Sequence, residues 1–201
     1  MRTPFSPTPS TAGTCSRRDF LNGLAAALAL LTANRPLRAD VPPAAAPAAA
    51  PGLPPGEPWA TLTLVQEHLF PSEAEAPGAS DINATAYLKA MLDLPDAVPE
   101  EKALIMDGAG WINLETANTF AGKTFADLNE DDREATLQRI AGSGAGQHWV
   151  LLLLYYIVEA LLSDPVYGGN PGGIGWRWLK HTPGFPQPTA GSRYFELQAR
   201  R

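Results

Sequence analysis

Cysteine is almost absent from this chain of 201 residues. The one cysteine, Cys15, lies near the N-terminus and precedes an apolar run, so it is not placed to carry a lipid anchor. Everything after it is free of cysteine. That absence excludes a disulfide framework, thioether-linked haem, cysteine-ligated iron–sulfur clusters and a cysteine nucleophile from the rest of the chain.

The signatures of other catalytic or metal-binding chemistry are missing as well. His68, His148 and His181 neither form an HExxH motif nor pair at ligand spacing, so a metal site has little support. No Gly-x-Ser-x-Gly elbow is present. The glycines of 168–175 follow a predicted helix and match neither the dinucleotide-binding nor the phosphate-loop pattern.

Alternation of β-branched residues is almost absent too, whereas apolar residues recur at helical spacing. We therefore predict an all-α fold, a single small domain of about five helices with an irregular Gly/Pro/aromatic C-terminal arm over 164–201. We expect the first helix to begin at Trp59 and end before Pro71, the second to be capped by Ser80 or Asp81, and the third to begin at Val98-Pro99. The fourth should run from an Asn129 cap to Gly142, and the fifth from Gln147 to Ser163.

The N-terminal region resembles a twin-arginine export signal. Its order is Ser16-Arg17-Arg18-Asp19-Phe20-Leu21 followed by an apolar run from Leu24 to Leu31. That run is far shorter than the ~20 apolar residues of a membrane span, so we expect a signal that is removed. We predict a signal peptide over 1–39, a Pro/Ala-rich linker over 40–58, and a folded domain over 59–201. Proteins exported this way are folded, and hold a cofactor or accompany a partner that does.

The charge of the predicted mature chain is strongly negative. Cleavage after Ala39 removes five of the 15 basic residues and one of the 21 acidic residues, which leaves a net charge of −10. Such a surface argues against nucleic acid as a partner. The segment 57–164 holds 18 acidic and five basic residues, whereas 165–201 holds five basic residues and only Glu196. The basic tail is either a solvated end or a feature that steers docking onto an acidic partner.

Two segments of the folded domain have two interpretations each. The ten residues from Trp149 to Val158 are almost entirely apolar, a run too short for a membrane span. They form either the central helix of a bundle, which we favour, or a helix whose outer side another protein covers.

The arm carries Tyr167, Trp176, Trp178 and Phe185 between glycines and prolines. These rings either fold back onto the core or anchor an interface, and the two are compatible.

One stretch of the arm resembles a known family. Asp164-Pro165-Val166-Tyr167-Gly168-Gly169-Asn170, then Gly175-Trp176 and Pro183-Gly184-Phe185-Pro186, are similar to the gluconate 2-dehydrogenase subunit 3 family, the small or gamma subunit of periplasmic sugar or sugar-acid dehydrogenases. The resemblance implies a non-catalytic subunit without its own cofactor. Its implied partners are an FAD-dependent dehydrogenase large subunit and a c-type cytochrome carrying haem c.

The resemblance also implies a location and roles for particular residues. Arg17, Arg18, Phe20 and Leu21 would direct the folded pair to the twin-arginine translocase. The complex would then lie in the periplasm, on the inner membrane through its partners. The residues expected to bind the partner are Tyr167, Gly168, Gly169, Asn170, Gly175, Trp176 and Trp178. Two other hypotheses are a stand-alone enzyme and a periplasmic module that binds a small ligand.

Overall fold

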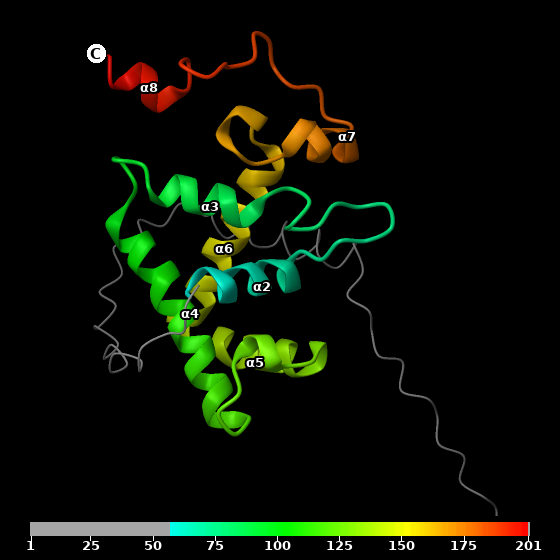
Figure 1. Ribbon diagram of the computed structural model, residues 1–201, viewed down its shortest axis with the longest axis vertical. Helices are drawn as coiled ribbons and strands as arrows, with labels where there is room; N and C mark the ends of the chain where they lie inside the picture. Colours follow the sequence, from blue (N-terminus) through cyan, green and yellow to red (C-terminus); the bar gives the residue numbers. More distant parts are fainter. Residues whose placement is uncertain (1–56, 201) are drawn as a thin grey trace, which may run out of the picture. The chain divides into compact units, whose positions relative to one another are not determined.

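The computed structural model describes residues 57–200. The predicted signal peptide, with Arg17, Arg18, Phe20 and Leu21, and nearly all of the linker lie outside the described residues. Within 57–200 there are seven α-helices and no strand, so the predicted all-α class is confirmed. The helices are α2 (Trp59–Leu69), α3 (Ala84–Leu92), α4 (Pro99–Thr119), α5 (Glu130–Ala141), α6 (Gly144–Leu162), α7 (Ile174–Leu179) and α8 (Tyr194–Gln198) (Figure 1).

Helix α6 is the centre of the bundle. It contacts α2, α3, α4, α5 and α7 (Figure 1). Its Trp149 and Leu153 are fully buried. The indole N–H of Trp149 donates to the backbone oxygen of Ile105 in α4, at 3.2 Å. A Cβ on Gly108 would lie 2.2 Å from that indole nitrogen, so only glycine lets α4 approach the ring so closely. The interpretation of this segment as the core helix is confirmed.

The predicted start of this helix at Gln147 is wrong, and the apolar run from Trp149 to Val158 belongs to a longer helix. The helix begins at Gly144, because the Ser143 hydroxyl accepts a hydrogen bond from the N–H of Gly146, at 3.0 Å. With 19 residues, α6 is long and apolar enough by length and composition to cross a bilayer. Its packing against five other helices explains its apolar character instead.

Local signals place two of the other helices where the sequence predicts them. Helix α4 begins at Pro99, with Glu100 and Glu101 in its first turn. Helix α5 follows Asn129, whose side-chain oxygen accepts a hydrogen bond from the N–H of Asp132 at 2.9 Å, and it ends at Gly142. In α5 the Asn129 side chain thus satisfies one of the free N–H groups at the helix start, whereas α4 starts with Pro99, which has no N–H to satisfy.

The predicted start of the second helix is wrong. Neither Ser80 nor Asp81 caps it, because α3 begins only at Ala84, after Asn83 in a left-handed conformation (φ 56°). The Asp81 carboxylate instead accepts hydrogen bonds from the Ser72 hydroxyl at 2.6 Å and from the N–H of Gly78 at 2.8 Å. These bonds lower the pKa of Asp81 and close the loop between α2 and α3.

Candidate functional site

The arm turns back onto α6 immediately after that helix ends. The Asp164 carboxylate accepts a hydrogen bond from the N–H of Val166 at 3.0 Å and starts the 3₁₀ turn Pro165–Tyr167. Gly168 then has a φ of +97°, a conformation that glycine adopts without strain. A second 3₁₀ turn, Pro171–Gly173, leads into α7. We call 164–179 the motif segment.

Asn170 joins the motif segment to the rest of the domain and is completely buried. Its side-chain oxygen accepts a hydrogen bond from the N–H of Gly175 at 2.7 Å, and its side-chain nitrogen donates to the backbone oxygen of Ser163 at 3.0 Å. Its own N–H donates to the backbone oxygen of Ile82 at 3.0 Å. One side chain therefore ties the end of α6 to the start of α7, while its backbone holds the segment that precedes α3.

The glycines of the motif segment allow it to lie directly on the α6 backbone. A Cβ on Gly169 would be 2.7 Å from the backbone oxygen of Ala160, and a Cβ on Gly175 would be 2.3 Å from that of Leu161. Both distances are shorter than real side chains tolerate. The Tyr-Gly-Gly-Asn and Gly-Trp pattern is thus explained by packing inside this chain.

The aromatic rings of the motif segment turn toward the chain as well. The indole N–H of Trp176 donates to the backbone oxygen of Leu162 at 2.8 Å, and the Trp178 ring lies 6.2 Å from that of Phe70. Phe185, beyond the motif segment, is 97% exposed. Folding back onto the core therefore accounts for both tryptophans, and the predicted role of this segment in partner binding stays a prediction.

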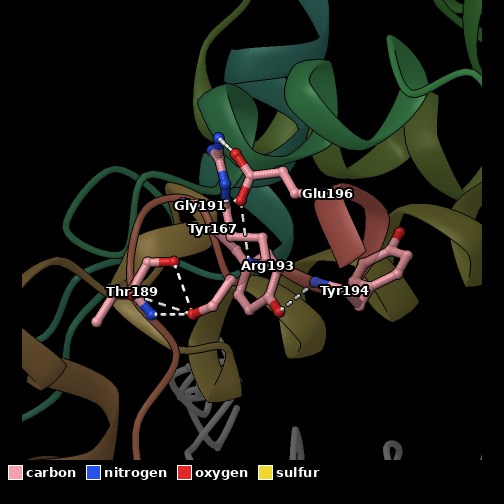
Figure 2. Close-up of polar contacts among 7 residues, drawn as sticks. Tyr167, Thr189, Gly191, Arg193, Tyr194 and Glu196 are labelled. Carbon is pink, nitrogen blue, oxygen red and sulfur yellow. Dashed lines mark hydrogen bonds and ion pairs between the residues drawn. The ribbon is translucent and has the colours of Figure 1, made fainter. Parts of the chain in front are cut away.

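The C-terminal residues are anchored on Tyr167 (Figure 2). The Tyr167 hydroxyl accepts a hydrogen bond from the N–H of Tyr194 at 3.3 Å, and the two rings lie 6.0 Å apart. The Glu196 carboxylate accepts from the N–H groups of Gly191 at 2.8 Å and Arg193 at 3.0 Å. It also pairs with the Arg193 guanidinium at 2.5 Å, the main reason why the pKa of Glu196 falls to about 2. Helix α8 was not predicted from the sequence, because Arg193 is not one of the usual capping residues, although Glu196 follows it at the spacing of a helix start.

Glutamates and tyrosines gather where α3, α4 and α6 meet. The Tyr156 hydroxyl donates to the Glu101 carboxylate at 3.0 Å, and the hydroxyl groups of Tyr155 and Tyr87 interact with Glu159. Burial raises the pKa of Glu159, the two tyrosine hydroxyls oppose this, and the negative charge of Glu101 adds to it. The hydrogen bond to Glu159 is the main cause that raises the pKa of Tyr155 to about 12.

This cluster was not predicted from the sequence. Glu159 directly follows the apolar run that ends at Val158, and Tyr87 and Glu101 lie far from it along the chain. The pair Tyr155-Tyr156 followed by Glu159 was the available signal, since residues four apart share one face of a helix.

The described residues show no arrangement suited to holding a metal ion. From 57 to 200, no group of three or more His, Cys, Asp and Glu side chains lies close enough together to do so. His68, in the last turn of α2, pairs with Glu134 at 2.8 Å, and this bond is the main cause of a lowered pKa of Glu134. His148 is exposed near the start of α6.

Comparison with known proteins gives one match. A family model described as Gluconate 2-dehydrogenase subunit 3 matches residues 57–184. No curated protein and no solved structure matches the chain. The matched region contains α2 to α7 and the whole motif segment, and it ends before α8.

Proposed function

Because this chain belongs to the gluconate 2-dehydrogenase subunit 3 family, we propose that it is the non-catalytic small subunit of an FAD-dependent gluconate or sugar dehydrogenase complex. In this proposal it binds and stabilises the flavoprotein subunit and directs the export of that folded subunit. The observation that carries the proposal is the match over 57–184, which spans nearly all of the folded domain.

The N-terminal sequence supports the export part of the proposal. Arg17 and Arg18 precede Phe20 and Leu21 in the order of a twin-arginine signal, and an apolar run follows. This pathway carries folded proteins, so a signal on one subunit suffices for a folded pair. The complex would then reside in the periplasm, bound to the inner membrane through its partners.

The division of chemistry between the subunits is part of the same proposal. FAD would be held by the large subunit and haem c by a cytochrome subunit, with none in this chain. Several acidic side chains have partners within this chain, since Asp81 closes a loop and Glu134 and Glu196 form ion pairs.

The test is purification from the native host by a tag on the C-terminus, followed by an absorption spectrum and subunit masses. We expect flavin absorption and a larger copurifying chain, and a partner held in the cytoplasm when Arg17 and Arg18 are both replaced by Lys. A colourless protein that purifies alone would contradict the proposal and favour a small-ligand module or a stand-alone enzyme. Normal export of the flavoprotein with the double Lys variant would contradict the export role.

A further inference from the structure

The outer side of α6 carries a stripe of apolar side chains that the other described elements cover only in part. Leu151, Tyr155 and Leu162 are 38%, 51% and 46% exposed, and they share one face of the helix with Glu159. Tyr194 of α8 is 43% exposed, and partial burial, with the negative charges of Asp96 and Glu159, raises its pKa. We call the surface formed by Leu151, Tyr155, Glu159, Leu162 and Tyr194, with Glu101 beside it, the Tyr155 face.

The tyrosines of the chain converge on this surface. All five, Tyr87, Tyr155, Tyr156, Tyr167 and Tyr194, belong to the cluster or to the contacts of α8 that adjoin it. Tyrosine is enriched in protein–protein interfaces because its ring is apolar and its hydroxyl can still bond to a polar group. Tyrosine is among the residue types that contribute most binding energy at interfaces, so the exposed rings of Tyr155 and Tyr194 are the side chains of this surface most suited to a partner.

The two carboxylates of the Tyr155 face have no positively charged partner. Glu101 and Glu159 are half-buried, and no ion pair within 57–200 involves either one. Lys102, which follows Glu101 in the sequence, pairs with Asp93 at 3.1 Å, and Arg193, which precedes Tyr194, pairs with Glu196 at 2.5 Å. A carboxylate that is withdrawn from water without a cation is unfavourable in the isolated chain, and a cation brought by a partner would remove that cost.

We propose that the Tyr155 face docks the large subunit of the dehydrogenase, through a partner surface of apolar side chains around an arginine that reaches Glu159 and Glu101. This inference rests on the proposed function and deepens it by naming the surface and its chemistry. Arginine suits the site better than lysine, because its planar guanidinium can bond to two carboxylates and stack on a tyrosine ring.

Charge complementarity distinguishes this occupant from two others. A second copy of the chain, related by a two-fold axis, would bring Glu101 and Glu159 of both copies toward one interface, and like charges oppose one another there. An anionic membrane surface attracts basic segments, whereas the charges of this face are acidic. A subunit whose docking surface carries apolar side chains and a positive charge would cover the apolar stripe and pair with the carboxylates.

The test compares tagged full-length chains in the native host, with the amount of copurifying large subunit and the rate of its dissociation as readouts. The variants are Glu159→Gln and Tyr155→Ala. Leu114→Ser is the control on another surface, because Leu114 is an apolar side chain, 37% exposed, that lies on α4 more than three helical turns from Glu101. We expect about a tenfold or greater loss of partner for each variant and none for the control. Thermal unfolding of each purified chain is measured in parallel.

The stability measurement separates docking from folding. Glu159→Gln removes a charge that is unfavourable in the isolated chain, so stability should hold or rise while partner binding falls. A variant that loses stability and partner together would overturn the proposal. If the wild-type chain binds its partner and both variants bind equally well, the Tyr155 face is not the docking surface, although the proposed function stands. If the wild-type chain purifies alone, the proposed function fails first. A dimer of this chain that Tyr155→Ala dissociates would identify a second copy as the occupant.

Discussion

The motif segment and the Tyr155 face use aromatic and polar residues in opposite ways. In the motif segment the polar side chain at the centre, Asn170, is completely buried and fully bonded, and Trp176 donates to α6. On the Tyr155 face the rings of Tyr155 and Tyr194 remain about half exposed, and Glu159 lacks a cation. The motif segment thus packs against its own chain, whereas the half-exposed rings and the unpaired carboxylate of the Tyr155 face are the features on which our docking proposal rests.

The difference shows that an aromatic ring in a Gly/Pro-rich segment is not by itself a sign of an interface. Glycine permits close backbone contact, and close contact allows the neighbouring tryptophan to reach a helix end. On α6, by contrast, other helices cover the inner face, and the rings that stay exposed are those on the outer face. Three predictions would break or sharpen this contrast.

The largest effect is expected for Asn170→Ala in the motif segment. The change leaves the buried N–H of Gly175 and the backbone oxygen of Ser163 without their partners, and each unsatisfied buried group costs about 1–3 kcal/mol. We expect the free energy of unfolding to fall by about 3 kcal/mol or more, as measured by urea denaturation followed by circular dichroism.

The matched control for the motif segment is Gly184→Ala. No heavy atom lies within 4 Å of a Cβ built there, so this change should alter stability by no more than about 0.5 kcal/mol. Equal, small effects of the two substitutions would show that the motif segment is not an internal structural element and that its pattern serves another purpose.

An intermediate effect is expected on the inner side of α6. Gly108→Ala places a Cβ 2.2 Å from the Trp149 indole and should destabilise the fold by about 1–3 kcal/mol, because the core is already filled. Gly110→Ala, on the same helix with open space around it, should stabilise the fold by up to about 1 kcal/mol, since alanine favours helix. Thermal unfolding of both variants decides the matter; destabilisation by both to the same extent would count against a tight α4–α6 crossing.

The smallest effect is expected for Glu159→Gln in the isolated chain, and this change should raise the free energy of unfolding at neutral pH, whereas Asn170→Ala and Gly108→Ala lower it. Because burial raises the folded pKa of Glu159 above its ordinary value, the native state binds more protons than the unfolded state between the two values. Wild-type stability should therefore fall as the pH rises from the ordinary pKa of glutamate through the raised one. The variant lacks this contribution, so its advantage over wild type should be absent at low pH and grow to a plateau above the raised pKa.

The measurement is the free energy of unfolding of both chains as a function of pH. Glu130→Gln is the control: its exposed carboxylate lies in the first turn of α5, where a negative charge is favourable. This control should lower stability slightly at neutral pH. A variant at Glu159 that is less stable than wild type at neutral pH would show that the carboxylate is satisfied within this chain.

Much of the helical architecture could be predicted because its signals are local. The Asn129 cap, the Pro99 start and the Gly142 end each act on backbone groups a few residues away. The start of α3 could not be predicted in this way. The Asp81 carboxylate could accept hydrogen bonds either from the first N–H groups of a helix or from the preceding loop. It bonds to Ser72 and Gly78 of the loop that joins α2 to α3, and these two helices pack against each other.

The sequence by itself determined the all-α class, the family through the motif segment, and the absence of cysteine after Cys15. Only the tertiary structure decided which rings turn inward, and only it brought Tyr87, Tyr155 and Tyr194 to the two glutamates. The physical reason is that helix signals depend on neighbours in the chain, whereas burial and charge environment depend on elements that meet in space.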